Sequence, residues 1–396
     1  MKVALVHDYI KEYGGAERVL EALHEIWPNA PIFTTVYLPE FLGPHKERFR
    51  DWDIRTSFLQ YLPFKEKLIS PFRLIAPWVF SQFDLRNFDV VIVSATGAYN
   101  PNMIQTLRLR SGHAKKTLHV CYCHTPPRYL YGYATAREWK RNFLSRVLGE
   151  IANHFLRLID FRNSQNVDFF IANSKNVSER ITKFYRRDSV VIYPPVDTAS
   201  GSSASSVELK NNKLDASLLD ARGYFVAGGR IARPKHIDLI VRACRELNVV
   251  LKVFGRGFAG YEYELKTQNP KLKNTTQSSK VEFVGEVTDE EKAKLMRNAK
   301  AFIFAGEDED FGITPVEAMS VGTPVIAYRS GGIIESVIEG RTGIFFDKLS
   351  IDSLRDAIKR LNDLNHLSKG DCIRQAQKFS KERFKKEIKE FVEKYV

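Results

Sequence analysis

Two carboxylates stand eight positions apart in the segment EDEDFGITPVEAM, residues 307–319. They are Glu309 and Glu317, and they belong to a chain whose formal net charge is +13. Proline suits the first position of a helix, so we expect a helix to begin at Pro315 with Thr314 as its N-cap. Thr314 and Glu317 would then form a capping box, which gives Glu317 a purely structural role.

A second role for the two carboxylates is the binding of a ligand with neighbouring hydroxyl groups, such as a sugar. Glu309 would lie in the loop and Glu317 in the first helical turn, where both can accept hydrogen bonds from hydroxyl groups. The backbone N–H groups of Phe311, Gly312 and Ile313 lie between them and would face oxygens of a sugar or phosphate. The other acids of the segment lack the spacing of a calcium loop, and we expect no metal site there.

Positive charge follows an expected strand in the segment GGRIARPKHIDLIV, residues 228–241. Arg230 and Lys235 flank a proline that stiffens the loop, directly before an apolar helix. Two cations in this position could neutralise a diphosphate leaving group without a metal ion. Taken without their context, the same two residues would be ordinary surface charges.

Two further motifs place glycines or a histidine where a strand gives way to a loop. Gly14 and Gly15 precede an amphipathic helix, whose N-terminus favours an anion, although a plain turn would use the same residues. His124 ends the strand segment CYCH and enters a stiff loop at Pro126 and Pro127. A histidine at the carboxyl end of a strand can reach a ligand, but an isolated histidine is more often structural.

The elements that must position these residues are short apolar strands separated by helical stretches. Nearly continuous apolar strands of this kind indicate parallel sheets covered by helices on both faces. Two series of them indicate two doubly wound α/β units whose strand ends would face one central cleft. The first series is KVALVHDY, VVIVSA, KTLHVCYCH, DFFIANS and SVVIYPPV, and the second is YFVAGGRI, VVLKVFGRG, VEFVGEV, AFIFAGE, TPVIAY and TGIFFD.

A segment rich in serine, glycine and asparagine divides the two series and cannot bury a core. We therefore expect an N-terminal domain at 1–197, a linker at 198–222 and a C-terminal domain at 223–377. The remaining residues 378–396 read as an amphipathic helix that would pack back on the N-terminal domain.

The excess positive charge is concentrated in residues 108–187, where sixteen Lys and Arg against five Asp and Glu give a net +11. Such a surface suits a phosphate-bearing ligand or an anionic membrane. Residues 58–83 mix aromatic and aliphatic residues with lysine and arginine, which fits a membrane surface or an ordinary pair of packed helices. No apolar run is long enough to cross a bilayer and no signal peptide is evident, so we expect a cytoplasmic protein. Four cysteines fit no metal-binding spacing and are expected to be buried free thiols: Cys121, Cys123, Cys244 and Cys372.

Together these motifs resemble the GT-B glycosyltransferases of family 4, which are retaining enzymes that use nucleotide-sugar donors. The resemblance covers almost the whole chain, through GGAE, HTPPRYLY, GRIARPKHIDLIV, VFGRG, the block from VEFVGEV to SVIEG, and TGIFF. The HTPPRYLY variant is most similar to mannosyltransferases that build surface polysaccharides from GDP-mannose. The resemblance implies an α/β fold of two Rossmann-like domains.

The resemblance also implies roles for individual residues. Arg230 and Lys235 would hold the donor diphosphate, and Glu317 would bind the ribose. The implied catalytic residues are His124, Arg230, Lys235 and Glu309. The implied donor-binding residues are Gly15 at the diphosphate, Gly255 and Val284 at the base, Phe311, Gly312 and Ile313 at the sugar, and Glu317.

The expected activity is therefore a metal-free, retaining transfer of mannose from GDP-mannose to a polyprenyl-diphosphate-linked glycan. The enzyme would bind the anionic inner face of the cell membrane peripherally, with no nucleic-acid partner. A UDP-sugar donor is the nearest alternative, and a phosphorylase or epimerase could share the same frame. Alternatives from other classes are a non-catalytic protein that binds a sugar nucleotide and a basic nucleic-acid-binding protein, for which no recognition module is evident.

Overall fold

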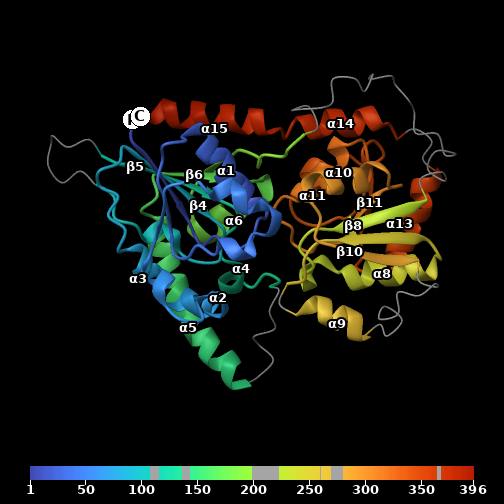
Figure 1. Cartoon of the computed structure of the whole chain (residues 1–396), viewed down its shortest axis with the longest axis horizontal. Helices are drawn as coiled ribbons and strands as arrows, with labels where there is room; N and C mark the ends of the chain where they lie inside the picture. The colour runs from blue at the N-terminus through green and yellow to red at the C-terminus, as the bar shows by residue number, and fades with distance from the viewer. Residues whose placement is uncertain (108–115, 136–142, 199–222, 259, 269–279, 364–366) are drawn as a thin grey trace. The chain divides into compact units, whose positions relative to one another are not determined.

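The computed structural model describes residues 1–107, 116–135, 143–198, 223–258, 260–268, 280–363 and 367–396 (Figure 1). These residues form two compact units. Unit 1 comprises the described residues of Met1–Tyr133, Trp139–Pro195 and Glu382–Val396, and unit 2 those of Ala134–Glu138 and Val196–Lys381. The expected linker at 198–222 lies, apart from its first residue, outside the described residues, so the domain limits drawn from the sequence stay predictions.

Unit 1 is built on a parallel sheet of seven strands in the order β3-β2-β1-β4-β5-β6-β7. The strands are β1 Val3–His7, β2 Ile32–Thr34, β3 Ile54–Thr56, β4 Val90–Ala95, β5 Leu118–Cys123, β6 Phe169–Ala172 and β7 Ser189–Val191. Every residue of β1 and β4 is buried, which is why both read as unbroken apolar runs. The sequence analysis missed β2 and β3, because three residues are too short to show a pattern.

Helices cover the sheet of unit 1, and two of the four longer ones follow a strand. They are α1 Gly15–Ile26, α2 Lys65–Leu68, α3 Ala76–Phe80, α4 Arg128–Tyr131, α5 Phe143–Ser164, α6 Lys175–Tyr185 and α15 Lys381–Tyr395. Short 3-10 helices lie at η1 Pro39–Phe41, η2 Gly43–Phe49, η3 Phe58–Tyr61, η4 Pro71–Leu74 and η5 Pro101–Met103.

Unit 2 repeats the design with a parallel sheet of six strands in the order β10-β9-β8-β11-β12-β13. The strands are β8 Tyr224–Gly228, β9 Val250–Phe254, β10 Val281–Gly285, β11 Phe302–Phe304, β12 Val325–Tyr328 and β13 Gly343–Phe346. The helices are η6 Arg233–Lys235, α8 Ile237–Glu246, α9 Tyr261–Gln268, α10 Asp289–Arg297, α11 Ile313–Ser320, α12 Ile333–Ser336, α13 Ile351–Asp363 and α14 Lys369–Gln377. All strands expected from the sequence are present, and so are the two parallel sheets.

The four cysteines are free and buried, as expected. Within the described part of the chain, no helix combines the length and the apolar character needed to cross a membrane.

The last helix of the chain, α15, belongs to the core of unit 1. Phe384, Ile388 and Val392 are buried in one cluster with strand residues that include Leu5 and Tyr122. The rings of Tyr122 and Phe384 lie 5.6 Å apart, and Arg383 Nη2 donates to the carbonyl oxygen of Tyr193 over 2.7 Å. Residues from the two ends of the chain therefore share one hydrophobic core.

We expect Phe384→Ala to lower the free energy of unfolding of unit 1 by about 3 to 5 kcal/mol, because it leaves a cavity under the sheet. Calorimetric unfolding would measure the loss. The matched control is Lys389→Ala on the exposed side of the same helix, which should shift the transition little. Equal melting temperatures for the two variants would contradict the packing of α15.

Helix α5 turns polar side chains toward the body of unit 1. Asn153, Asp160 and Asn163 are buried on its inner face. Asp160 accepts hydrogen bonds from Asn100 Nδ2 over 3.1 Å and from the hydroxyl of Tyr131 over 2.8 Å. Burial raises the pKa of the Asp160 carboxyl to about 7, although hydrogen bonds from tyrosine hydroxyls oppose the shift.

This raised pKa predicts a pH dependence of stability. Between the unfolded pKa near 3.8 and the folded pKa near 7, the folded state binds more protons at Asp160 than the unfolded state does. Asp160 therefore destabilises the fold as the pH rises, by roughly 1.4 kcal/mol per unit of pKa difference. The melting temperature of Asp160→Asn relative to the wild type should therefore rise between about pH 4 and 7. A constant difference across that range would refute the assignment.

Candidate active site

The carboxyl ends of β8, β9 and β10 lie side by side in unit 2, and the expected donor loop begins there. Gly229 follows β8, Gly255 follows β9, and the N–H of Gly255 donates to the carbonyl oxygen of Gly285 over 2.7 Å. Gly255 has a φ of 117°, and a Cβ at this position would overlap the carbonyl oxygen of Gly229. The close approach of two backbones thus requires glycine at Gly255. Val284, the other expected base-pocket residue, is half-buried beside Gly285.

Arg230 leaves this strand edge with an exposed side chain. Its guanidinium lies 5.1 Å from the centre of the Phe258 ring, which limits its orientation. Thr314 Oγ1 lies 3.4 Å from the point where a Cβ on Gly229 would stand. The loop that bears Arg230 therefore runs past the start of α11.

Lys235, which was expected to bind phosphate, is in direct contact with Glu309, which was expected to bind the sugar. Lys235 Nζ donates a hydrogen bond to Glu309 Oε2, and the two side chains are 26% and 18% exposed. The ammonium also lies 4.8 Å from the centre of the Phe304 ring in β11. A lysine ammonium has three N–H donors, so the contact with Glu309 leaves Lys235 able to bind a phosphate oxygen as well.

Two glycines that the sequence analysis gave no role hold the loop of Glu309. A Cβ on Gly331 would overlap backbone atoms of Glu309, and a Cβ on Gly332 would overlap the carbonyl oxygen of Asp310. The N–H of Gly332 donates to the carbonyl oxygen of Glu309 over 2.7 Å. The pair Gly-Gly after a strand was the available signal, because such a pair permits close backbone contact.

The helix after this loop begins earlier than expected. Helix α11 starts at Ile313, with Gly312 as its N-cap at a φ of 88° and no side-chain cap. The expected capping box between Thr314 and Glu317 is therefore wrong, because the left-handed conformation open to glycine starts the helix two residues upstream. Phe311 contributes only its backbone to this edge, since its ring is buried against Phe379 at 5.2 Å.

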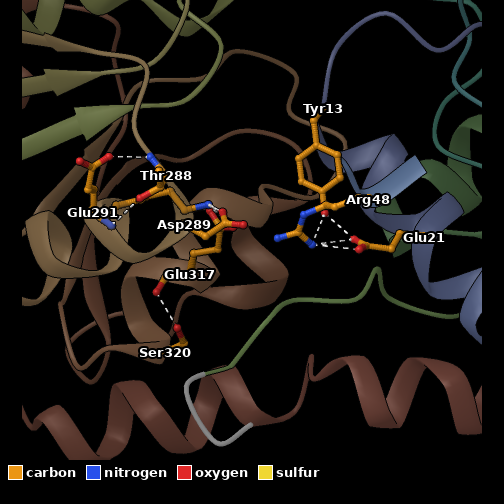
Figure 2. Close-up of polar contacts among 9 residues, drawn as sticks. Tyr13, Glu21, Arg48, Thr288, Asp289, Glu291, Glu317 and Ser320 are labelled. Carbon is orange, nitrogen blue, oxygen red and sulfur yellow. Dashed lines mark hydrogen bonds and ion pairs between the residues drawn. The ribbon is translucent and has the colours of Figure 1, made fainter. Parts of the chain in front are cut away.

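Glu317 is held by a lysine rather than by its own helix terminus (Figure 2). Lys292 Nζ donates to Glu317 Oε1 over 2.8 Å and to Asp289 Oδ1 over 2.9 Å. Lys292 and Asp289 lie at the start of α10, whereas Glu317 lies in α11. Thr288 and Glu291 form the capping box that starts α10. The sequence analysis missed Lys292, whose three-residue spacing from Asp289 was the one local signal.

Unit 1 contains a buried row of polar side chains across the ends of three neighbouring strands. Ser94 Oγ lies 3.2 Å from His7 Nδ1 and 2.9 Å from His124 Nε2. His7 Nε2 lies 3.7 Å from Glu17 Oε1. His7 and Ser94 are fully buried, Glu17 is 5% exposed and His124 is 9% exposed, so His124 is the most exposed member of the row. Burial, with the neighbouring His7, lowers the pKa of His124 to about 3.

Glu17 also fixes the start of helix α1. Its Oε2 accepts the N–H of Gly14 over 2.8 Å, and Gly15 is the exposed first residue of the helix. Glu21 lies one turn further along α1, and its Oε1 accepts a hydrogen bond from Arg48 Nη1 over 2.9 Å (Figure 2). Arg48 Nη1 also donates to the Tyr13 hydroxyl over 3.2 Å. These contacts determine the backbone path through Gly15.

The buried carboxyl of Asp8 lies on the same strand edge. Asp8 Oδ2 accepts the N–H of Thr96 over 2.8 Å, and burial raises the pKa of Asp8. The sequence analysis missed Asp8, His7, Ser94 and Glu17. For Asp8, His7 and Ser94, the signal that could have found them was their position at the ends of predicted parallel strands; Glu17 lies in helix α1 and gave no such signal.

The structure thus brings Arg230, Lys235, Glu309, Gly312 and Gly255 to one edge of unit 2, with Glu317 one helical turn further along α11. His124 and Gly15 lie in unit 1, and their assignment to the donor stays a prediction. Over the described ranges, no group of three or more His, Cys, Asp or Glu side chains is arranged to hold a metal ion.

Two protein-family models match the chain. The model described as Glycosyltransferase Family 4 matches residues 13–200, and the model described as Glycosyl transferases group 1 matches residues 212–379. Together they account for most of the sequence.

Individual relatives are distant. The alpha-1,3/1,6-mannosyltransferase ALG2 of Dictyostelium discoideum is 26% identical over 265 residues, which are 61% of this chain and 61% of that protein. An uncharacterised glycosyltransferase of Methanocaldococcus jannaschii is 28% identical, over 52% of each chain. The match therefore spans less than two thirds of the length of either relative.

A solved structure shares the fold. The sucrose-phosphate synthase of Thermosynechococcus elongatus is 17% identical and superposes with a TM-score of 0.68 over 100% of this chain and 99% of that one. The two-domain α/β fold of the GT-B type expected from the sequence is confirmed.

The geometry of His124 predicts that its imidazole stays neutral in the folded protein down to about pH 4, one unit above its pKa. In the unfolded state the His124 imidazole takes up a proton near pH 6.5, whereas in the folded state it does not. The free energy of unfolding therefore decreases as the pH falls below 6.5. Nuclear magnetic resonance of ¹⁵N-labelled histidine would follow the ring, with His124→Gln to assign its signal. A midpoint between pH 6 and 7 for that signal would contradict the buried row.

Proposed function

Because the chain belongs to the GT-B glycosyltransferases of family 4, we propose that it is a retaining hexosyltransferase that moves mannose from GDP-mannose to a lipid-linked glycan. The observation that carries this proposal is the contact between Lys235 and Glu309 at the start of α11, beside the loop of Arg230. A cation for phosphate and a carboxylate for sugar hydroxyls meet there. The match to a mannosyltransferase supports the choice of mannose.

In the proposed reaction, the bond between the anomeric carbon and the donor diphosphate breaks while an acceptor hydroxyl bonds to that carbon on the same face. The leaving phosphate gains negative charge, which Arg230 and Lys235 stabilise together with the N-terminal dipole of α11. The departing phosphate oxygen takes the proton of the acceptor hydroxyl. Two fixed cations supply the charge that a metal ion would otherwise provide, so the proposal needs no metal.

The two carboxylates have separate tasks in this proposal. Glu309 accepts hydrogen bonds from hydroxyl groups of the transferred sugar and keeps Lys235 next to them. Glu317 binds the ribose, and Lys292 orients its carboxylate through Oε1. Gly255 and Val284 offer backbone and apolar surface to the base, which suits guanine without excluding uracil. A UDP-sugar donor is therefore the alternative to be decided by experiment.

The acceptor in this proposal is a glycan on a polyprenyl diphosphate, reached at the anionic cytoplasmic face of a membrane. The segment of residues 58–83 exposes apolar side chains beside cations, which supports a surface of this kind. Tyr61 is 83% exposed, Phe64 67% and Trp78 57%. Lys67 is exposed between them and lies against the Phe64 ring.

A thermal-shift screen of GDP-, UDP- and ADP-sugars would test the donor site. We expect GDP-mannose to raise the melting temperature most, and Arg230→Ala or Glu317→Gln to weaken its binding roughly 10- to 100-fold, because each removes a charge-assisted hydrogen bond. Arg256→Ala is the matched control, since Arg256 is an exposed arginine of the same unit that pairs with Glu286.

The donor assignment fails if no nucleotide-sugar stabilises the wild type, or if both site variants respond as Arg256→Ala does. Transfer of labelled mannose to a polyprenyl-diphosphate-linked glycan would then test the reaction. A product with inverted anomeric configuration would refute the retaining mechanism.

A further inference from the structure

Helix α5 exposes a continuous apolar stripe. Phe143 is 81% exposed, Phe155 60%, Leu148 58% and Ile151 53%. Val147, Leu158 and Phe161 extend the same exposed set. Single exposed apolar residues are common on protein surfaces, but a run at helical spacing over five turns marks an interaction surface.

The amphipathic pattern of α5 is inverted relative to an ordinary surface helix. Its inner face carries buried polar side chains, Asn153, Asp160 and Asn163, while most of its apolar side chains face outward. Residues 147, 151, 155 and 158 follow one another at intervals of four, four and three, which places them on one side of the helix. The polar interior network of Asp160 fixes this orientation, so the outward stripe is a built feature of unit 1.

The charge of the exposed stripe is wholly positive. The exposed residues of α5 whose side chains are described are all apolar except Arg146, His154 and Arg162. Glu150 is half-buried, and its Oε2 lies 4.0 Å from Arg157 Nη1. Apolar side chains flanked by arginines complement a bilayer that carries anionic headgroups.

A second exposed apolar surface lies on a segment that is linked to α5 through α4. The Arg73 guanidinium of η4 lies 4.3 Å from the centre of the Tyr129 ring in α4. The Asn153 side chain of α5 donates to the carbonyl oxygen of the same tyrosine over 3.4 Å. Residues 58–78, with exposed Phe64, Leu74 and Trp78, therefore join α5 through α4. Figure 1 shows α5 with its N-terminal end leading away from the sheet.

We propose that α5 is the membrane-docking element of this protein and lies on an anionic lipid bilayer, with its apolar stripe in the acyl-chain boundary and its arginines at the phosphates. This inference rests on the proposed function, because a lipid-linked acceptor requires the enzyme to reach a membrane. It assigns that contact to α5, which lies within the basic window of residues 108–187 that the sequence analysis related to an anionic membrane without naming a helix. Residues 58–78 form a second contact beside it.

Vesicle flotation of the full chain tests this assignment. The test variant is the double substitution Ile151→Glu with Phe155→Glu, and the matched control is Val190→Glu, since Val190 is a 46% exposed apolar residue on β7 of the same unit. We expect wild type and control to float with phosphatidylglycerol vesicles and the double variant to lose binding at least tenfold. Phosphatidylcholine vesicles should recover less wild-type protein.

Several outcomes would overturn the proposal. These are no flotation of the wild type, equal flotation of the double variant, and equal recovery with neutral vesicles. A dimer in sedimentation that the double variant abolishes, without vesicle binding, would assign the stripe to self-association instead. The thermal shift by GDP-mannose should be unchanged in the double variant, because that response depends on unit 2, so failure of docking and failure of the donor site are distinguishable.

A labelling experiment tests the depth of the stripe without disrupting binding. The four native cysteines are buried, so Phe155→Cys provides a selective site for an environment-sensitive fluorophore. We expect blue-shifted emission on anionic vesicles and quenching by brominated acyl chains. The same label at Val190→Cys should show neither change, and an unquenched label at position 155 would overturn the insertion of α5.

Discussion

The parallel arrangement of strands determines where this protein can place reactive groups. In both sheets every strand pairing is parallel, so the carboxyl ends of all strands lie along one edge of each sheet. His7, Ser94 and His124 meet along that edge in unit 1, as Gly229, Gly255 and Gly285 do in unit 2. Residues far apart in sequence become neighbours without any long loop, because the sheet sets their spacing.

Within unit 2, pairing with lysine explains why a basic chain gathers carboxylates. Glu309 pairs with Lys235 and Glu317 with Lys292, and each pair joins two different loops or helices. The second pair is the more buried, with side chains 15% and 10% exposed. Removing one partner of a buried pair leaves an uncompensated charge and costs about 3 to 5 kcal/mol. The acids therefore orient the lysines as much as they offer oxygen atoms to a ligand.

Sequence alone predicted the two sheets, because buried parallel strands read as apolar runs whatever their neighbours are. Through the family resemblance it assigned Lys235 to the diphosphate and Glu309 to the sugar, but it did not predict that the two side chains pair. It failed where tertiary contacts decide: the left-handed Gly312 moved the start of α11, and Lys292 took the place of the expected cap on Glu317. The row from His7 to His124 was missed because its members stand at the ends of different strands, and only the strand order β1-β4-β5 reveals that they are adjacent.

The position of α15 has a consequence for how the protein is made. Phe384, Ile388 and Val392 complete the core under β1 and β5, although unit 2 lies in the sequence between β7 and α15. Synthesis proceeds at about 5 to 20 residues per second, so the strands of unit 1 are made well before α15 can cover their apolar surface. Unit 1 therefore cannot complete its core until unit 2 has been synthesised.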